Sequence, residues 1–256
     1  MLGNKICFVS IDVESDRGAK EFRGVENLGK ILDIFKKYEI PATLFVTGEV
    51  LERYGRMAKN WQTDYEIACH SYTHRFWNAL NRDERKKELE DFIELYWSIF
   101  RKKPLGFRAP SHIIDKEGIE LLEKSGFLYD SSIVPHYPPF KKYRGYKGRA
   151  PLRPYRPNGV RILEIPVRGQ IFGIPLAGAW IRGLPLWFYD FLFSIYSPPF
   201  ITLSMHSWDA LSPSYLAKLE KILKILKREN YQFLNAAQIT NTWFPHDPLL
   251  LETRGF

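Results

Sequence analysis

Short apolar runs alternate with amphipathic helical patterns along most of this 256-residue chain. The first run, KICFVSID at residues 5–12, has the branched composition of a buried strand, and apolar residues at helical spacing follow at 24–38. Further strands are predicted at 40–48, 65–70, 105–110, 161–167 and 200–206, and helices after 48 and at 83–103, 115–126, 184–196 and 212–230. Strands that alternate with helices form βαβ units, so the sequence predicts an α/β fold with a parallel, barrel-like sheet.

The chain contains no stretch that resembles a long interdomain linker, and a single domain over residues 1–256 is expected. The exception to regular patterning is an irregular loop at about 132–160, rich in Pro, Gly, Tyr and Arg. Its segment 141–157 holds seven basic residues, three tyrosines and no acid. This segment is either a solvated loop or a clamp for phosphate or an acidic glycan, because arginine forks match such oxygens.

The composition limits the partners and the cellular compartment. A net charge of +8 favours acidic or phosphate-bearing partners, and 45% hydrophobic residues are enough for a sizeable core. Cys7 and Cys69 lie inside apolar runs, so buried reduced thiols are expected rather than a disulfide framework. The first residues lack the pattern of a secretory leader, and Pro198-Pro199 interrupts the longest uncharged stretch. A cytoplasmic protein is therefore expected.

The segment LPLWFYDFLFSIY at 184–196 is apolar nearly all round a helix. Such a helix is usually buried, and the alternative is a helix that lies on a membrane surface. Beside a basic loop, this alternative predicts contact with an anionic membrane surface or a lipid-linked sugar at the cytoplasmic face. Nucleic-acid binding would explain the charge but not the residues at the strand ends, so no nucleic-acid partner is expected.

Polar residues follow four of the predicted strands, at the ends where functional groups of a parallel barrel gather. The residues at these ends are Asp12 and Glu14, His70 and His74, Arg108, and His206. A pair of histidines four apart is ordinary alone, since histidines in cores and on surfaces are commonly satisfied by hydrogen bonds. Two imidazoles with one carboxylate, however, leave open positions on a divalent ion, as catalytic sites require. A second carboxylate and a separate histidine add a base and an acid, which suits cleavage of an amide or ester.

Five elements in order resemble the polysaccharide deacetylases, carbohydrate esterase family 4, with its NodB-homology domain. They read SIDVES, IPATLFVTG, HSYTH, FRAPS and LSMHSWD, with ILEIPV as a further match, and cover roughly residues 5 to 210. The D-V-E spacing is similar to one branch of that family. The resemblance implies a distorted (β/α) barrel with fewer than eight strands.

The resemblance also implies a role for each matching residue. Asp12 would be the general base, His206 the general acid, and Arg108 would hold the base carboxylate in place. The implied metal ligands are Glu14, His70 and His74, and the implied substrate-binding residues are Pro110, Ser111, Trp208 and Asp209, with the backbone N–H near Ser111 helping to hold the oxyanion.

The sequence departs from the family pattern at two points. Adjacent aspartates are replaced by Asp12 and Glu14 with Val13 between them; residues two apart share a strand face, and Asp16 stays open as the alternative ligand. The aspartate–tryptophan element that usually tunes the late histidine is not found, and Asp209 or Arg182 is a candidate substitute. Of the remaining histidines, His112 and His136 are expected in loops lining the cleft, and His246 is assigned no role. Strand alternation should turn Cys69 away from the site.

The sequence thus predicts a metal-dependent hydrolase that removes an N-acyl group, acetyl or formyl, from an amino sugar in a polysaccharide, oligosaccharide or lipid-linked sugar. Zinc suits the ligands, and cobalt, nickel, iron or manganese would also bind. Two alternatives stay open. One is hydrolysis of a cyclic amide or ureide by the same fold, and the other is a glycan-binding module without catalysis.

Overall fold

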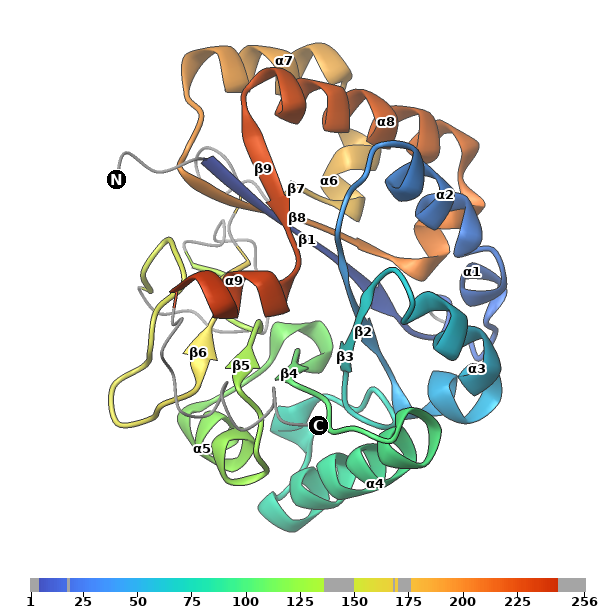
Figure 1. The fold of residues 1–256 in the computed structure, drawn as a ribbon, viewed down its shortest axis with the longest axis vertical. Coiled ribbons are helices and arrows are strands. Elements are labelled where there is room, and N and C mark those ends of the chain that lie inside the picture. Colours follow the sequence, from blue (N-terminus) through green and yellow to red (C-terminus); the bar gives the residue numbers. More distant parts are fainter. Residues whose placement is uncertain (1–4, 18, 136–149, 168, 170–175, 244–256) are drawn as a thin grey trace.

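A single parallel sheet organises the protein. The computed structural model describes residues 5–17, 19–135, 150–167, 169 and 176–243 (Figure 1). The sheet order is β6-β5-β4-β3-β2-β1-β8-β7, with β9 also paired to β1, and every pairing between these strands is parallel. The strands are β1 Lys5–Val13, β2 Thr43–Val46, β3 Glu66–Cys69, β4 Gly106–Phe107, β5 Tyr129–Asp130, β6 Leu163–Glu164, β7 Leu176–Ala177, β8 Phe200–His206 and β9 Tyr231–Leu234.

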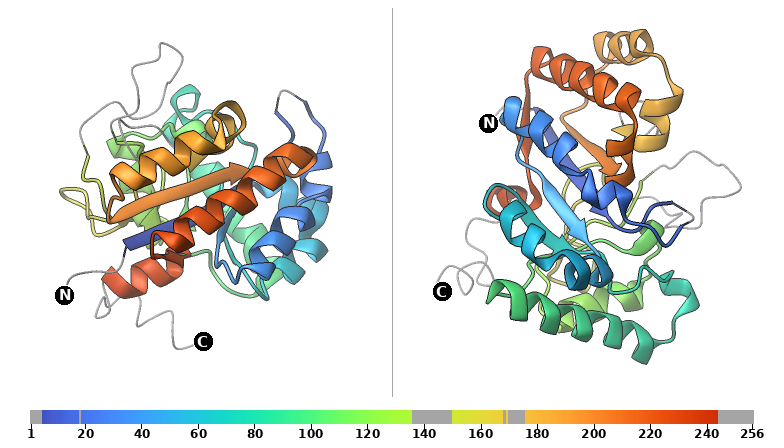
Figure 2. Two further views of the ribbon diagram at one scale, coloured as in Figure 1. Left: turned by 90° about the horizontal axis from the view of Figure 1, so that it is seen from above. Right: turned by 90° about the vertical axis from the view of Figure 1, so that its right-hand side faces the viewer.

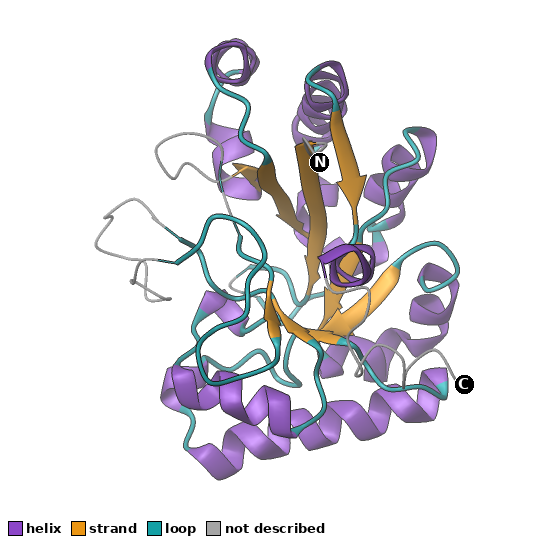
Figure 3. Cartoon of the chain, turned by 60° about the vertical axis from the view of Figure 1, so that its left-hand side comes forward, coloured by secondary structure: helices purple, strands orange, loops and turns teal. Residues whose placement is uncertain are grey.

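Helices cover the outer side of the curled sheet, except the last one, whose Ala236 and Ile239 pack in the same hydrophobic cluster as Phe8 and Phe45 (Figures 2 and 3). They are α1 Arg23–Glu26, α2 Gly29–Lys37, α3 Gly48–Trp61, α4 Arg82–Phe100, α5 Lys116–Lys124, α6 Gly178–Gly183, α7 Leu186–Ile195, α8 Pro213–Arg228 and α9 Ala236–Trp243. Three 3-10 turns complete the set: η1 Trp77–Ala79, η2 Pro110–His112 and η3 Ser207–Leu211.

Strand alternation separates two hydrophobic clusters and places the polar residues between them. In β8, Ile201, Leu203 and Met205 belong to the large outer cluster beneath the helices, whereas Phe200 belongs to a smaller inner cluster. Side chains two apart share a face, so His206 lies on the inner side with Phe200. The same rule in β1 places Ser10 and Asp12 on the inner side with Phe8, since Cys7, Val9, Ile11 and Val13 lie in the outer cluster.

The parallel α/β architecture predicted from the sequence is confirmed, but the expected strand number is wrong. Within the described residues, eight strands follow one another in the sheet, and β9 pairs with the first half of β1 as a ninth. The elements β5, β7, β9, α6 and α9 were not predicted. The two-residue strands β5 and β7 are too short for their residues to show a period. The helix expected at 24–38 is two helices, because Asn27 and Leu28 interrupt it.

Several local predictions are confirmed. The Asp115 side chain accepts a hydrogen bond from the Gly118 N–H at the start of α5, and Gly126 beyond its end has φ +88°. Cys7 and Cys69 are buried free thiols, and Cys69 belongs to the outer cluster, away from the site. Of the irregular loop expected at about 132–160, residues 136–149 lie outside the described residues, as do His136 and His246. Among the described helices, none has the length and apolar character needed to span a membrane.

A buried carboxyl pair joins β5 to β6, with Asp130 and Glu164 opposite each other in register. Ser132 Oγ donates to Asp130 Oδ1 over 2.6 Å, and the Ile133 N–H donates to Glu164 Oε1 over 3.0 Å. Burial raises the pKa of Asp130 to about 6. Burial also raises the pKa of Glu164 well above its usual range, and the neighbouring Asp130 raises it further. The pair therefore retains a proton that separate carboxyl groups would have lost.

Because of this pair, the free energy of unfolding is expected to fall as pH rises. Folding raises both pKa values, so the contribution is full below the unfolded pKa of about 4 and is lost as pH rises through about 6 and above. Each carboxyl group can change the free energy of unfolding by at most about 1.4 kcal/mol per pH unit. The Glu164→Gln variant has a neutral amide at this position and is expected to lose much of this pH dependence. Urea unfolding at acidic and alkaline pH measures the slope, and an equal slope in both proteins would contradict the prediction.

Candidate active site

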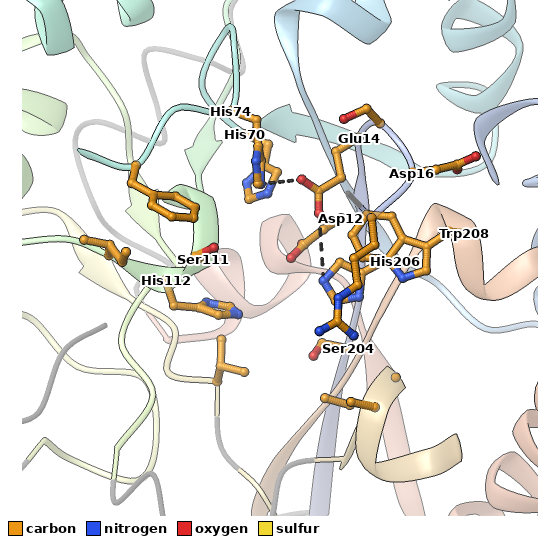
Figure 4. Close-up of a pocket in the computed structure, with 18 of the residues that line it drawn as sticks. Asp12, Glu14, Asp16, His70, His74, Ser111, His112, Ser204, His206 and Trp208 are labelled. Atoms are coloured by element: carbon orange, nitrogen blue, oxygen red, sulfur yellow. Dashed lines mark ion pairs between the residues drawn. The ribbon is translucent and has the colours of Figure 1, made fainter. Parts of the chain in front are cut away.

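Polar side chains from different strand ends surround one cavity of about 880 Å³ (Figure 4). The β1 and β8 ends are adjacent because Asp12 is the register partner of His206. The predicted site residues that line the cavity are Asp12, Glu14, His70, His74, Ser111, His206 and Trp208. Residues that are far apart in the sequence therefore meet at one cavity, as expected for the carboxyl ends of strands in a parallel sheet.

Glu14, His70 and His74 form the described group that could hold a metal ion. Their ligand atoms lie within 4.8 Å of one another, and Glu14 Oε2 makes an ion pair with His74 Nε2. The two histidine rings have centroids 5.0 Å apart. Two imidazoles and one carboxylate fit a divalent cation and leave coordination positions for water or substrate.

The His70 ring is oriented by a backbone carbonyl. His70 Nδ1 lies 2.8 Å from the Arg108 carbonyl oxygen. Because a carbonyl oxygen only accepts, Nδ1 must carry the proton and Nε2 keeps the lone pair that binds a metal. Burial lowers the pKa of His70, which favours this neutral, ligating form.

Asp16, the alternative ligand, has a structural role. Its Oδ2 accepts from the Arg23 N–H over 3.1 Å and its Oδ1 from the Gly24 N–H over 2.9 Å, which caps the start of α1. Strand β1 ends at Val13, so the two-residue alternation no longer applies at position 16. Asp16 lines the cavity but is not part of the Glu14–His70–His74 group.

Arg108 is fully buried and holds the Asp12 carboxylate. Its Nη1 donates to Asp12 Oδ1 over 2.7 Å and to Ser10 Oγ over 2.9 Å. Its Nε and Nη2 donate to the backbone oxygen and the hydroxyl of Ser131, both over 2.9 Å. Burial alone would raise the pKa of Asp12, but the Arg108 guanidinium and nearby imidazoles outweigh it and lower the pKa below its usual range. Asp12 is therefore ionised and fixed in orientation.

His206 lies across the cavity from His70 (Figure 4). The Trp208 ring stacks on its imidazole with centroids 4.2 Å apart, and His206 Nε2 is 3.9 Å from Glu14 Oε1. Asp209 Oδ2 accepts from the His206 backbone N–H over 2.9 Å and lies 4.0 Å from its Nδ1. Asp209 in turn pairs with Arg182. Asp209 and Arg182 were the two candidates for tuning His206. Asp209 contacts His206 directly, and Arg182 pairs with Asp209.

Two predicted substrate-binding residues do not line the cavity within the described part of the chain. Asp209 is 1% exposed and acts behind His206, and Pro110 is buried at the start of η2. Pro110 instead begins the turn that presents Ser111 and His112, whose φ values are 54° and 58°. His112 lines the cavity, as expected, and burial lowers its pKa to about 3, so it is neutral.

A buried glutamate on α4 holds the turn between His70 and His74. Glu88 Oε2 accepts from the Ser71 hydroxyl over 2.9 Å and from the Tyr72 and Thr73 N–H groups over 2.8 Å. Ser71 and His74 have positive φ values of 64° and 57°, which L residues rarely adopt without support. Sequence reasoning missed Glu88, because nothing in its helical pattern showed that it faces this turn.

Glu88 is expected to affect metal affinity although its side chain is not one of the residues that could hold the ion. The Glu88→Ala variant removes the acceptor of these hydrogen bonds and is expected to weaken the binding of a divalent metal ion by Glu14, His70 and His74 about 10–100-fold. Competition with a chromophoric chelator measures the affinity. The exposed Glu90 on the same helix provides the control, Glu90→Ala, which should leave it unchanged. Equal affinities for the two variants would contradict this role.

Further residues that were not assigned to the site from the sequence also line the cavity. They come from loops, from the unpredicted β7 and α6, and from the end of the segment predicted as a strand at 161–167. They include the basic Arg17 and Lys20 and the apolar Phe76, Ile113, Val134, Val167, Ala177 and Trp180.

Comparisons with known proteins show which proteins this chain is similar to. Residues 15–129 match the sequence profile of the family described as polysaccharide deacetylase. A peptidoglycan deacetylase-like protein of Gibberella zeae is 36% identical over 125 residues, which cover 48% of this chain and 37% of that protein. A peptidoglycan deacetylase of Helicobacter pylori is 32% identical over 114 residues, covering 44% and 39%. The match thus spans less than half the length of these relatives.

Solved structures share the fold across nearly the whole chain. A Puue allantoinase superposes with a TM-score of 0.72 and 18% identity, covering 96% of this chain and 92% of that one. A family 4 carbohydrate esterase from Bacillus anthracis has a TM-score of 0.59 and 18% identity, covering 93% and 84%. The chain is thus similar in sequence to the polysaccharide deacetylase family over residues 15–129, and it shares the fold of a family 4 carbohydrate esterase over nearly its whole length.

Proposed function

We propose that this protein is a metal-dependent hydrolase that removes an N-acetyl group from an amino sugar. One observation carries the proposal. The Glu14–His70–His74 group, the Arg108-held Asp12 carboxylate and His206 all face the same cavity. A cation-binding group, a base and an acid are the parts that hydrolysis of an unactivated amide requires.

Each residue has a role that follows from its contacts. A divalent ion held by Glu14, His70 and His74 would polarise the acyl carbonyl and acidify a water molecule. Asp12, ionised and fixed by Arg108, accepts the proton of the attacking water. His206, backed by Asp209, donates a proton to the departing amine, so the amide C–N bond breaks while a new C–O bond forms. The exposed Ser111 presents its backbone at the cavity, where an N–H can stabilise charge on the acyl oxygen.

We further propose acetyl as the acyl group and zinc as the metal. The printed names of the relatives, which are peptidoglycan deacetylases, support an acetylated glycan, in polymeric, oligomeric or lipid-linked form. The donor set of two nitrogens and one carboxylate oxygen supports zinc, with cobalt, nickel, iron or manganese as alternatives.

Acetate release tests this function. The purified protein, stripped with a chelator and reloaded with defined metals, is incubated with N-acetylated glucosamine oligosaccharides and peptidoglycan fragments. Metal-dependent acetate release is expected. Metal-independent hydrolysis of allantoin would support the ureide alternative instead. Oligosaccharide binding without acetate release would support a glycan-binding module.

We also propose a cytoplasmic location. The buried free thiols of Cys7 and Cys69 support it, since reducing compartments keep such cysteines unpaired. Cell fractionation with an antibody against the intact protein tests it, and recovery from the culture medium would contradict it.

A further inference from the structure

Helix α7 carries a row of large apolar side chains on the surface of the protein. Trp187, Phe191 and Ile195 expose 69%, 54% and 61% of their area, and Tyr196, just after the helix, exposes 47%. The three helical residues are spaced four apart, so they form one stripe. Of the eight large hydrophobic residues exposed in the described part of the chain, these four lie within ten residues of one another. Such clustering marks an interaction surface rather than scattered exposure.

The opposite side of α7 is packed against the protein. Tyr189, Leu192 and Phe193 are buried there, so the expectation of a buried helix holds for one side only. The apolar stripe, defined as Trp187, Phe191, Ile195 and Tyr196, therefore needs a separate explanation. The helix stands at the edge of the molecule, with α8 beside it (Figures 1 and 2).

Positive charge flanks the apolar stripe. Arg228 of α8 pairs with Asp190 of α7 over 2.8 Å, so that side of α8 faces α7. Lys221 lies seven residues before Arg228, on the same side of the helix, and Lys224 lies between them. Both lysines are exposed. The surface thus combines an aromatic row with neighbouring cations, on a protein of net charge +8.

We propose that α7 docks this protein onto the surface of an anionic lipid bilayer. The apolar stripe enters the headgroup region, where Trp and Tyr rings are favoured, while Lys221 and Lys224 face the lipid phosphates. A second copy of the chain fits less well, because a symmetric contact would bring the same lysines of both copies close together. Charge complementarity therefore favours the bilayer.

Docking through α7 also places the bilayer close to the cavity. Trp180 and Arg182 of α6 line the cavity, and only two residues separate the end of α6 at Gly183 from the start of α7 at Leu186. The contact therefore brings one wall of the cavity near the lipid headgroups. The docking itself does not depend on the proposed reaction.

Sedimentation with lipid vesicles tests the docking. The protein is expected to bind vesicles of phosphatidylcholine mixed with phosphatidylglycerol at low salt, and more weakly to pure phosphatidylcholine. Trp187→Ser combined with Phe191→Ser should lower the partition coefficient at least about tenfold. Replacing Lys221 and Lys224 by Gln should lower it roughly fivefold for each charge removed. The matched control is Trp97→Ser on α4, whose side chain is 49% exposed and which should bind as the unaltered protein does.

Circular dichroism and thermal unfolding verify that each variant is folded. Absence of binding to the anionic vesicles at low salt would overturn the proposal, as would equal binding by the Trp187/Phe191 variant and the Trp97 control. Light scattering that shows a dimer dissociated by the same two substitutions, without vesicle binding, would assign the stripe to a second copy and also overturn it. Acetate release from a soluble oligosaccharide is measured in parallel and needs no bilayer. Its result therefore distinguishes a failure of docking from a failure of the proposed function.

Discussion

The Asp12→Asn variant is expected to lose about 10²–10⁴-fold in kcat/KM for acetate release, the usual contribution of a general base. The amide keeps an acceptor for Arg108 but cannot take the proton of the attacking water. The neighbouring Glu14–His70–His74 group is unaltered, so zinc affinity should change little. Steady-state acetate release and metal content, measured on the same sample, check these two expectations, and thermal unfolding verifies that the variant is folded.

Asp16→Asn is the matched control for this substitution. Asp16 lines the same cavity, but both of its carboxylate oxygens are engaged in capping α1. Asparagine keeps one of these two acceptors, so α1 loses one hydrogen bond, worth about 1 kcal/mol of stability, while activity should fall less than about threefold. Similar losses in the two variants would show that charge in the cavity, rather than a specific base at position 12, supports the reaction.

Removal of the His206 imidazole is predicted to lower kcat/KM about as much as Asp12→Asn does, because it impairs departure of the amine rather than attack by water. The His206→Ala variant should lose about 10²–10⁴-fold on an amide substrate, whose amine must be protonated to leave. An activated aryl acetate has a leaving group that needs no proton, so its hydrolysis should fall much less. Measuring both substrates therefore isolates the acid role.

The outcome that would contradict this assignment is an equal loss on the amide and the aryl ester. Such a result would indicate that His206 acts on the attack step or on cavity structure. The stacked Trp208 ring makes the structural effect measurable, since its packing partner disappears in the variant. Near-ultraviolet circular dichroism reports whether the indole environment has changed.

The sequence predicted the residues that lie directly at strand ends. Asp12 lies next to the last residue of β1, His70 directly follows β3 and His206 ends β8, and a parallel sheet brings such ends to one edge. Period-two alternation then decides which side chains face the cavity, as it does for Asp12 beside the outward Val13. These are local rules, so one chain is enough to apply them.

Residues that act through long-range contacts could not be predicted in this way. Glu88 is an ordinary helical glutamate in the sequence, and only the packing of α4 brings it to the Ser71–Thr73 turn. Ser131 receives Arg108 because β5 pairs with β4, and a strand of two residues has no detectable period. Asp16 is the opposite case, because its position in the sequence made it a candidate metal ligand. Strand β1 ends at Val13, however, and the Asp16 side chain instead accepts hydrogen bonds from the start of α1.

Titration of zinc into chelator-stripped protein, with acetate release and bound metal measured together, tests the central claim most directly. The account predicts that activity on an N-acetylated oligosaccharide rises in proportion to zinc bound at Glu14, His70 and His74, and reaches its plateau at a single equivalent per chain. The His74→Ala variant should bind zinc weakly and stay inactive at that ratio. Full activity in the stripped protein, or in that variant without bound metal, would contradict the account.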